Sequence, residues 1–91
     1  MRTYWGMKDA RPLLLTLLEK RDKEGKETAF FMATNWLAGQ MEIKNPSAEQ
    51  YMEDILNAGY IKTNRFLVSL TEMGKKEIER LRGEGRIREM R

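Results

Sequence analysis

The chain has 91 residues with a net charge of +3, and 41% are hydrophobic and 34% charged, which fits one small globular domain. It contains no cysteine and no histidine, which excludes disulfides, thiolate or imidazole metal sites and catalysis by these side chains. No apolar run is long enough to span a bilayer, and residues 1–11 lack the apolar stretch of a signal peptide, so we expect a cytoplasmic protein without membrane contact.

The chain is predicted to begin with an irregular segment followed by a helix. Residues 1–9 show no period, and Trp5 is expected to pack either on the domain edge or in an interface. The first helix is predicted from Asp9 or Ala10 to about Glu24, with Pro12 in its first turn and Gly25 directly after its end.

Leucines cover an unusually wide part of this first helix. At about 100° per residue they span roughly 200° of the circumference, whereas one core-facing side needs only about 100°. The helix is therefore expected to be buried on two sides, by the C-terminal helix, by a second subunit or by both. These leucines are Leu13, Leu14, Leu15, Leu17 and Leu18.

Two further helices are predicted, separated by a short loop. One begins near Thr28 and ends at Gly39 or Met41, and its Met32 and Trp36 lie on a side of their own, where they pack under the N-terminal segment or touch a partner. The next begins with Asn45 as N-cap and Pro46 at the first helical position, and it ends at Gly59.

A β-hairpin and a fourth helix complete the domain. Residues 60–63 and 66–70 are rich in β-branched and aromatic residues and flank the polar pair Asn64–Arg65, which predicts a two-residue turn. Thr71 is predicted to cap the last helix, and residues 83–91 form a basic tail that either continues this helix or frays.

The order of these elements resembles the winged helix-turn-helix family of DNA-binding regulators, including MarR-like, PadR-like and archaeal or viral proteins. Residues 52–61 resemble the end of a recognition helix that leads through a Gly into the first wing strand. Residues 70–76 resemble the strand-to-helix junction that follows the wing. The resemblance covers residues 10–82 and implies a mainly α fold with a small β-hairpin wing, in the order helix-helix-helix-hairpin-helix.

The resemblance also implies a DNA-binding surface on the third helix and the wing. Residues near the start of that helix would meet base edges, and residues before it and at the wing tip would contact the phosphate backbone or the minor groove. One departure from the family is that this helix contains three acidic residues and no Lys or Arg. The implied contacts are Lys44, Asn45, Ser47, Gln50, Tyr51, Asp54, Lys62, Asn64 and Arg65.

The charge of the chain is unevenly distributed. Residues 1–26 carry +3, residues 27–60 carry −4 and residues 61–91 carry +4, so polyanions should be attracted to the two ends. Alternating signs in the C-terminal stretch predict a salt-bridged solvent-facing side.

The sequence therefore predicts a homodimeric, sequence-specific transcriptional regulator that binds double-stranded DNA. The alternative is a winged-helix module that contacts another protein through its third helix. No carboxylate pair suggests an enzyme, no cofactor or metal is expected, and a small-molecule effector is left open. The predicted dimer interface comprises Trp5, Leu13, Leu14, Leu17, Ile78 and Leu81.

Overall fold

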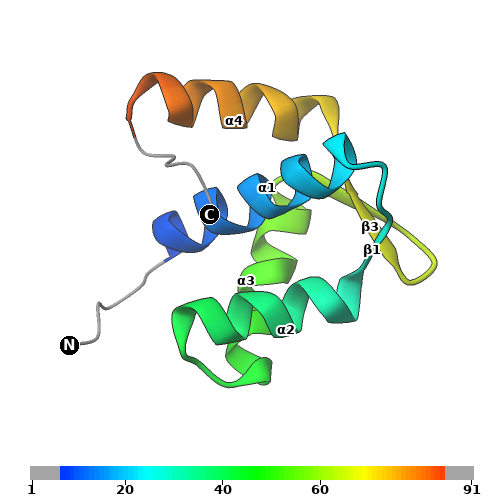
Figure 1. Cartoon of the computed structure of the whole chain (residues 1–91). Helices are drawn as coiled ribbons and strands as arrows, with labels where there is room; N and C mark the ends of the chain where they lie inside the picture. Colours follow the sequence, from blue (N-terminus) through cyan, green and yellow to red (C-terminus); the bar gives the residue numbers. More distant parts are fainter. Residues whose placement is uncertain (1–6, 86–91) are drawn as a thin grey trace.

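Four helices and three short strands make up residues 7–85, the part of the chain that the computed structural model describes, with side chains from Ala10 onward (Figure 1). The helices occur in the predicted order, and the predicted hairpin precedes the last of them. The elements are α1 (Met7–Lys23), β1 (Thr28–Ala29), α2 (Phe30–Met41), α3 (Asn45–Asn57), β2 (Ile61–Asn64), β3 (Leu67–Leu70) and α4 (Glu72–Gly83).

Helix α1 is the central element of the fold. It lies between α4 on one side and α2 on the other, and it also packs against α3 and β3 (Figure 1). It begins at Met7, earlier than predicted, so Pro12 lies inside the helix and not in its first turn. Gly25 follows the helix at a φ of 71°, as expected for a residue that ends a helix in the left-handed conformation.

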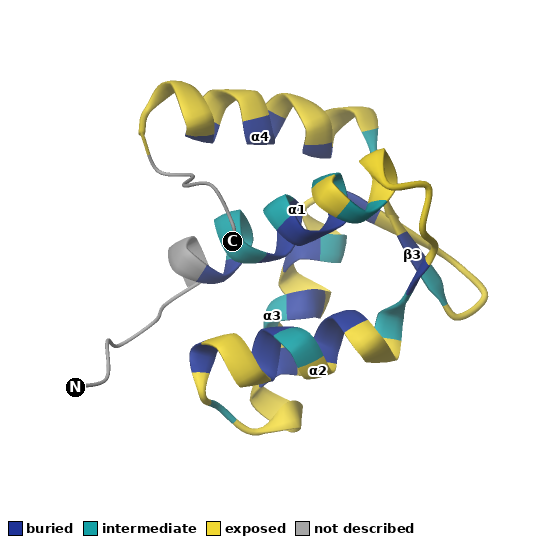
Figure 2. Ribbon diagram, viewed as in Figure 1, coloured by how far each residue is buried: buried dark blue, intermediate teal, exposed yellow. Residues whose placement is uncertain are grey.

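The wide leucine stripe of α1 is covered by the chain itself. Leu14 and Leu15 are 0% exposed, and the buried sides of α2 and α4 face this helix (Figure 2). Because its own elements cover α1 on both sides, the stripe does not require a second subunit. Of the residues predicted at a dimer interface, Leu14, Leu17, Ile78 and Leu81 are buried inside this single chain, Leu13 is half-buried against the core, and Trp5 lies outside the described residues.

The sheet has the order β1-β3-β2, and both pairs of strands are antiparallel. The second helix begins at Phe30, two residues after its predicted start near Thr28, because Thr28 itself pairs with Val68 of β3. A β-branched residue suits this position. Thr28 is also buried, and its hydroxyl accepts a hydrogen bond of 2.8 Å from Nε of Arg21.

The turn of the hairpin lies one residue later than predicted. Asn64 pairs with Leu67, so the two turn residues are Arg65 and Phe66, and it is Arg65 that has a positive φ of 61°. This register turns Ile61 and Val68 into the core. A slip of one residue would reverse the side on which each strand residue lies, so burial overrides the turn preference of asparagine.

Helix α4 is anchored at its start to the end of α3. The hydroxyl of Thr71 accepts from the Gly74 backbone N–H at 3.0 Å and donates to the Gly59 carbonyl, so the predicted N-cap is confirmed. The Thr71 N–H donates to the Tyr60 carbonyl at 3.1 Å. Gly74 lies directly against the Tyr60 carbonyl. A Cβ added at Gly74 would be only 2.0 Å from the carbonyl oxygen.

Candidate nucleic-acid interface

The solvent-facing side of α3 carries most of the residues predicted to meet bases. Ser47, Gln50 and Asp54 are exposed on the side opposite the buried residues of this helix. Tyr51 differs, because its half-buried side chain packs against the hydrophobic core. It follows the buried Ala48 by three residues and so lies towards the core side of the helix, which sets it apart from the exposed Ser47, Gln50 and Asp54 as a predicted base contact.

The start of α3 is built differently from the prediction. Lys44, and not Asn45, occupies the N-cap position, and no side chain caps the helix there. The Asn45 amide instead donates to Oδ1 of Asn35 on α2, which ties the two helices together at this point. Asn45 and Lys44 are both exposed, so both remain accessible to a ligand at this end of the helix.

The solvent-facing side of α3 is acidic. Glu49, Glu53 and Asp54 are all exposed, and residues 45–57 contain no Lys or Arg. A surface of this kind repels phosphate but offers carboxylate oxygens to hydrogen-bond donors. Any attraction to a nucleic-acid backbone has to come from residues outside the helix.

Three exposed cations flank α3 along the sequence. Lys44 precedes α3, whereas Lys62 and Arg65 belong to the hairpin that follows it. Within the described part of the chain, no carboxylate forms an ion pair with any of the three. Their charges are therefore available to an anionic ligand.

The hairpin tip also exposes an aromatic ring that the sequence interpretation assigned to a strand. Phe66 is 70% exposed, and its backbone carbonyl accepts from the Phe30 N–H at 2.7 Å. This hydrogen bond places the tip beside the first turn of α2. Asn64 is exposed at the end of β2, so the tip presents a polar, a cationic and an aromatic side chain in succession.

Most cations of α4, in contrast, are paired with carboxylates within the protein. Arg80 contacts Glu77 and Glu84, each at 2.7 Å, and Arg82 contacts Glu19 of α1 at 2.7 Å. The predicted salt-bridged side of the C-terminal stretch is confirmed for the described residues. These arginines are committed to carboxylates within the protein.

Glu77 is the centre of the ion-pair network that joins α4 to α1. Its carboxylate is 6% exposed and accepts from Arg80 and from Arg11, in both cases at 2.7 Å. The hydrogen bond from Arg80 is the largest cause that lowers the pKa of Glu77, to about 2, against the opposing effect of burial and with further help from Arg11. The Arg11 guanidinium also lies 5.1 Å from the centre of the Tyr60 ring, so the network reaches the base of the hairpin.

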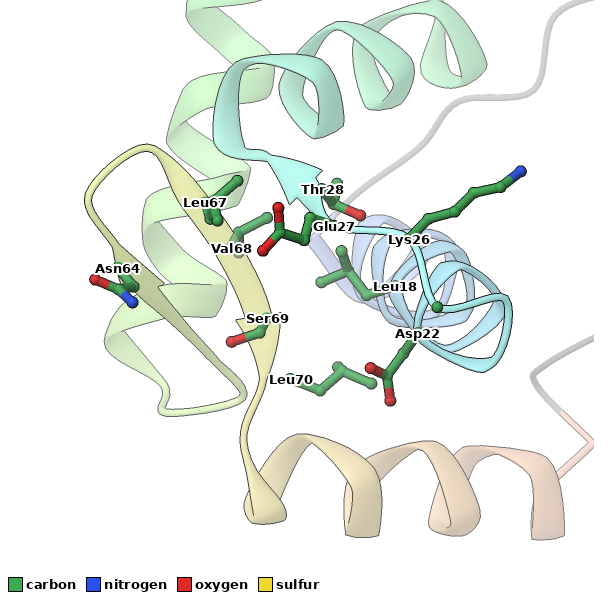
Figure 3. A pocket seen from close by; sticks show the side chains of 11 residues that line it. Leu18, Asp22, Lys26, Glu27, Thr28, Asn64, Leu67, Val68, Ser69 and Leu70 are labelled. Carbon is green, nitrogen blue, oxygen red and sulfur yellow. The ribbon is translucent and has the colours of Figure 1, made fainter.

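A groove of about 380 Å³ lies between the end of α1, the loop that follows it and β3 (Figure 3). Its apolar surface comes from Leu18, Leu67, Val68 and Leu70. The carboxylates of Asp22 and Glu27 line the same groove as Lys26, whose ammonium group lies 3.3 Å from Glu24. This lining is unsuited to a phosphate, which separates the groove from the candidate nucleic-acid surface.

Helix α2 exposes apolar residues on the side that faces away from the core. Met32 is 36% exposed, whereas Trp36 is half-buried and packs against the core, so the two residues do not form one exposed pair. Phe31 is the most exposed hydrophobic residue of the helix, at 69%. The sequence interpretation missed it, although its neighbours along the chain indicated an unusually apolar helix.

No protein-family model, no curated protein and no solved structure matches the chain. Within residues 7–85, no helix has the length and apolar character needed to cross a membrane. No group of acidic side chains in the same part of the chain has the arrangement of a metal site.

Proposed function

We propose that this protein is a winged helix-turn-helix DNA-binding regulator that contacts duplex DNA through α3 and the β2–β3 hairpin. The observation that carries the proposal is the contrast between two sets of cations. On α4, Lys75, Arg80 and Arg82 are paired with carboxylates, whereas Lys44, Lys62 and Arg65 have no such partner among the described residues and belong to the segment before α3 and the hairpin after it. The mainly helical fold with a small antiparallel sheet is compatible with this family.

The dimensions of α3 suit the major groove. Its 13 residues span about 20 Å, and the groove is about 12 Å wide, so a helix lying in it brings its ends near the phosphate strands. Lys44 would contact the backbone at one end, and the hairpin would contact it at the other. Three neutralised phosphates predict a slope of about −3 for log affinity against log salt.

The acidic side of α3 gives this interface a defined base preference. Carboxylates accept hydrogen bonds from the exocyclic amino group of cytosine, and glutamine pairs with adenine. Asp54 and Gln50 are exposed on this side and have the chemistry for these contacts. We therefore propose that the cations supply affinity while Gln50 and Asp54 supply selectivity.

Fluorescence anisotropy with a labelled random duplex over a range of salt concentrations tests the proposed phosphate contacts. The double variant Lys62→Ala/Arg65→Ala should reduce the magnitude of the slope by about 2. The double variant Lys75→Ala/Lys76→Ala on α4 removes the same charge and serves as the control. If both variants reduced the magnitude of the slope equally, only the net charge of the protein would determine the affinity, and the proposed docking surface would be wrong.

Selectivity is tested separately, once a preferred duplex has been selected from a random pool. Gln50→Ala should weaken binding to that duplex and leave random duplexes unaffected, whereas Arg65→Ala should weaken binding to both alike. If Gln50→Ala has no effect on either, α3 does not read bases through this residue.

The second candidate is a module that binds another protein through α3. The acidic patch of Glu49, Glu53 and Asp54 favours it, because a basic protein surface complements these charges directly. This function predicts negligible affinity for duplex DNA at moderate salt and capture of a protein partner that is lost when the three acidic residues are replaced by their amides.

A further inference from the structure

The groove between the end of α1 and β3 has the size and the apolar surface of a small-molecule site (Figure 3). Its volume of about 380 Å³ lies in the range of about 300–1,000 Å³ that is typical of ligand pockets. Leu18 and Val68 line the groove and are buried, so their positions are fixed by the core. A ligand that fits this groove is therefore small and partly apolar.

The charged side chains of the groove determine which sign of charge the ligand carries. Figure 3 shows the carboxylates of Asp22 and Glu27 turned towards the β3 side of the groove, whereas the Lys26 side chain extends away from β3. The Lys26 ammonium group is also paired with Glu24, at 3.3 Å. Among residues 10–85, no cation forms an ion pair with Asp22 or Glu27. Both carboxylates are therefore available to a cationic ligand.

The groove also contains a backbone acceptor, because β1 is shorter than β3. Strand β1 pairs only with Leu67 and Val68, so the end of β3 has no neighbouring strand on this side. The backbone groups of successive strand residues face opposite neighbours, and the Thr71 N–H donates to the Tyr60 carbonyl on the β2 side. The Leu70 carbonyl therefore faces the groove, where no backbone N–H of residues 7–85 donates to it.

The same geometry disfavours a protein segment as the occupant. A peptide that adds to a sheet edge needs several free strand residues for its main-chain hydrogen bonds. Here only Ser69 and Leu70 lie beyond the reach of β1, and α4 begins at Glu72. The free edge is therefore long enough for a single polar group and too short for an added strand.

We propose that this groove binds a small organic cation with an apolar body, of the arylalkylammonium class. The ammonium group donates charge-assisted hydrogen bonds to Asp22 and Glu27 and a further hydrogen bond to the Leu70 carbonyl. The apolar body lies on Leu18 and Val68. An anion of the same shape is repelled by both carboxylates, and a neutral analogue loses the charge-assisted hydrogen bonds. The site does not depend on DNA binding.

Titration of the isotope-labelled full chain with phenylbutylammonium at neutral pH, followed by heteronuclear NMR, tests the site. The amide signals of Thr28, Ser69 and Leu70 should shift and saturate with a Kd of about 1 mM, as expected for a ligand of this size. Phenylbutanol and phenylbutyrate keep the apolar body without the positive charge, and methylammonium keeps the charge without the body. Each of the three should bind at least about tenfold more weakly.

Two matched double variants test the contribution of the groove carboxylates. Asp22→Asn/Glu27→Gln should lower the affinity for phenylbutylammonium at least about tenfold. Glu72→Gln/Glu79→Gln removes the same charge from exposed positions of α4 and should leave the affinity unchanged. Circular dichroism checks that both variants remain folded.

Three results would overturn the proposal. They are the absence of saturable shifts at the groove in the parent protein, equal binding of the ammonium compound and its neutral analogue, and equal losses in the two double variants. No duplex is present in these titrations, so their outcome is independent of whether the protein binds DNA.

Discussion

Replacing Glu77 by glutamine should remove an ionic contribution to the stability of α4 and of its contact with α1. The carboxylate accepts from Nε and one terminal nitrogen of Arg80 and from a terminal nitrogen of Arg11, over distances of 2.7 to 2.9 Å. Glutamine keeps the size of the side chain but loses the charge and leaves two guanidinium groups facing a neutral amide. The change therefore isolates the ionised form of Glu77.

The pKa of Glu77 sets the magnitude and the pH window. Its ordinary value of 4.5 falls to about 2 in the folded chain. At about 1.36 kcal/mol per pH unit, this difference corresponds to a stabilisation of about 3 kcal/mol. Because the folded-state pKa is the lower one, the contribution is present above pH 4.5 and is lost as the pH falls towards 2.

Urea unfolding followed by circular dichroism measures this contribution. At neutral pH, Glu77→Gln should lower the free energy of unfolding by about 2–3 kcal/mol, and the difference from the parent should shrink towards zero near the folded-state pKa. Glu79→Gln, at an exposed position of the same helix, is the matched control and should change little. A Glu77→Gln deficit of the same size at neutral and at acidic pH would refute the ionic origin of this stability.

Three further changes test the junctions around the hairpin, each by urea unfolding at neutral pH. Gly74→Ala should destabilise the protein by about 2–3 kcal/mol despite the better helix propensity of alanine, because the added Cβ overlaps the Tyr60 carbonyl; an unchanged stability would show that this approach is not close. Thr71→Val should cost about 1–2 kcal/mol through loss of the cap on α4 and of the hydrogen bond to the Gly59 carbonyl. Arg65→Gly should raise stability by about 0.5 kcal/mol, because a positive φ at the first turn position favours glycine, while anisotropy shows weaker binding to all duplexes. A loss of stability in the Arg65→Gly variant would contradict this explanation of the turn.

The number and order of the helices were predictable, and at the end of α1 and the start of α4 local signals also located the helix boundaries. Gly25 at the end of α1 and Thr71 at the start of α4 act through backbone geometry and a side-chain cap, which depend on only a few neighbouring residues. The order of elements followed from these signals and from the apolar periodicity. It did not require knowledge of which surfaces meet.

Features that depend on contacts between distant segments were not predictable in the same way. The first strand forms because Thr28 and Ala29 pair with β3, which lies about forty residues later in the chain. The turn position depends on which hairpin residues the core buries, and that choice moved the tip to Arg65 and Phe66. The leucine stripe of α1 indicated a second covering surface correctly, but its periodicity left open whether the C-terminal helix or a second subunit supplies that surface.

The number of phosphates that one copy can neutralise depends on how many of its cations lack a carboxylate partner, and not on the total number of cations. Arg80 and Arg82 would have to leave carboxylate partners before binding phosphate, so the many basic residues near the C-terminus overstate the attraction to DNA. If Lys44, Lys62 and Arg65 supply the backbone contacts, one copy has a salt slope of about −3, whereas two copies on one duplex have a slope of about −5. The slope measured over a range of protein concentrations therefore tests how many copies contact one duplex. A steeper slope at higher concentration requires that both copies contact DNA. A constant slope of about −3 would mean that only one copy contacts the duplex at every concentration tested.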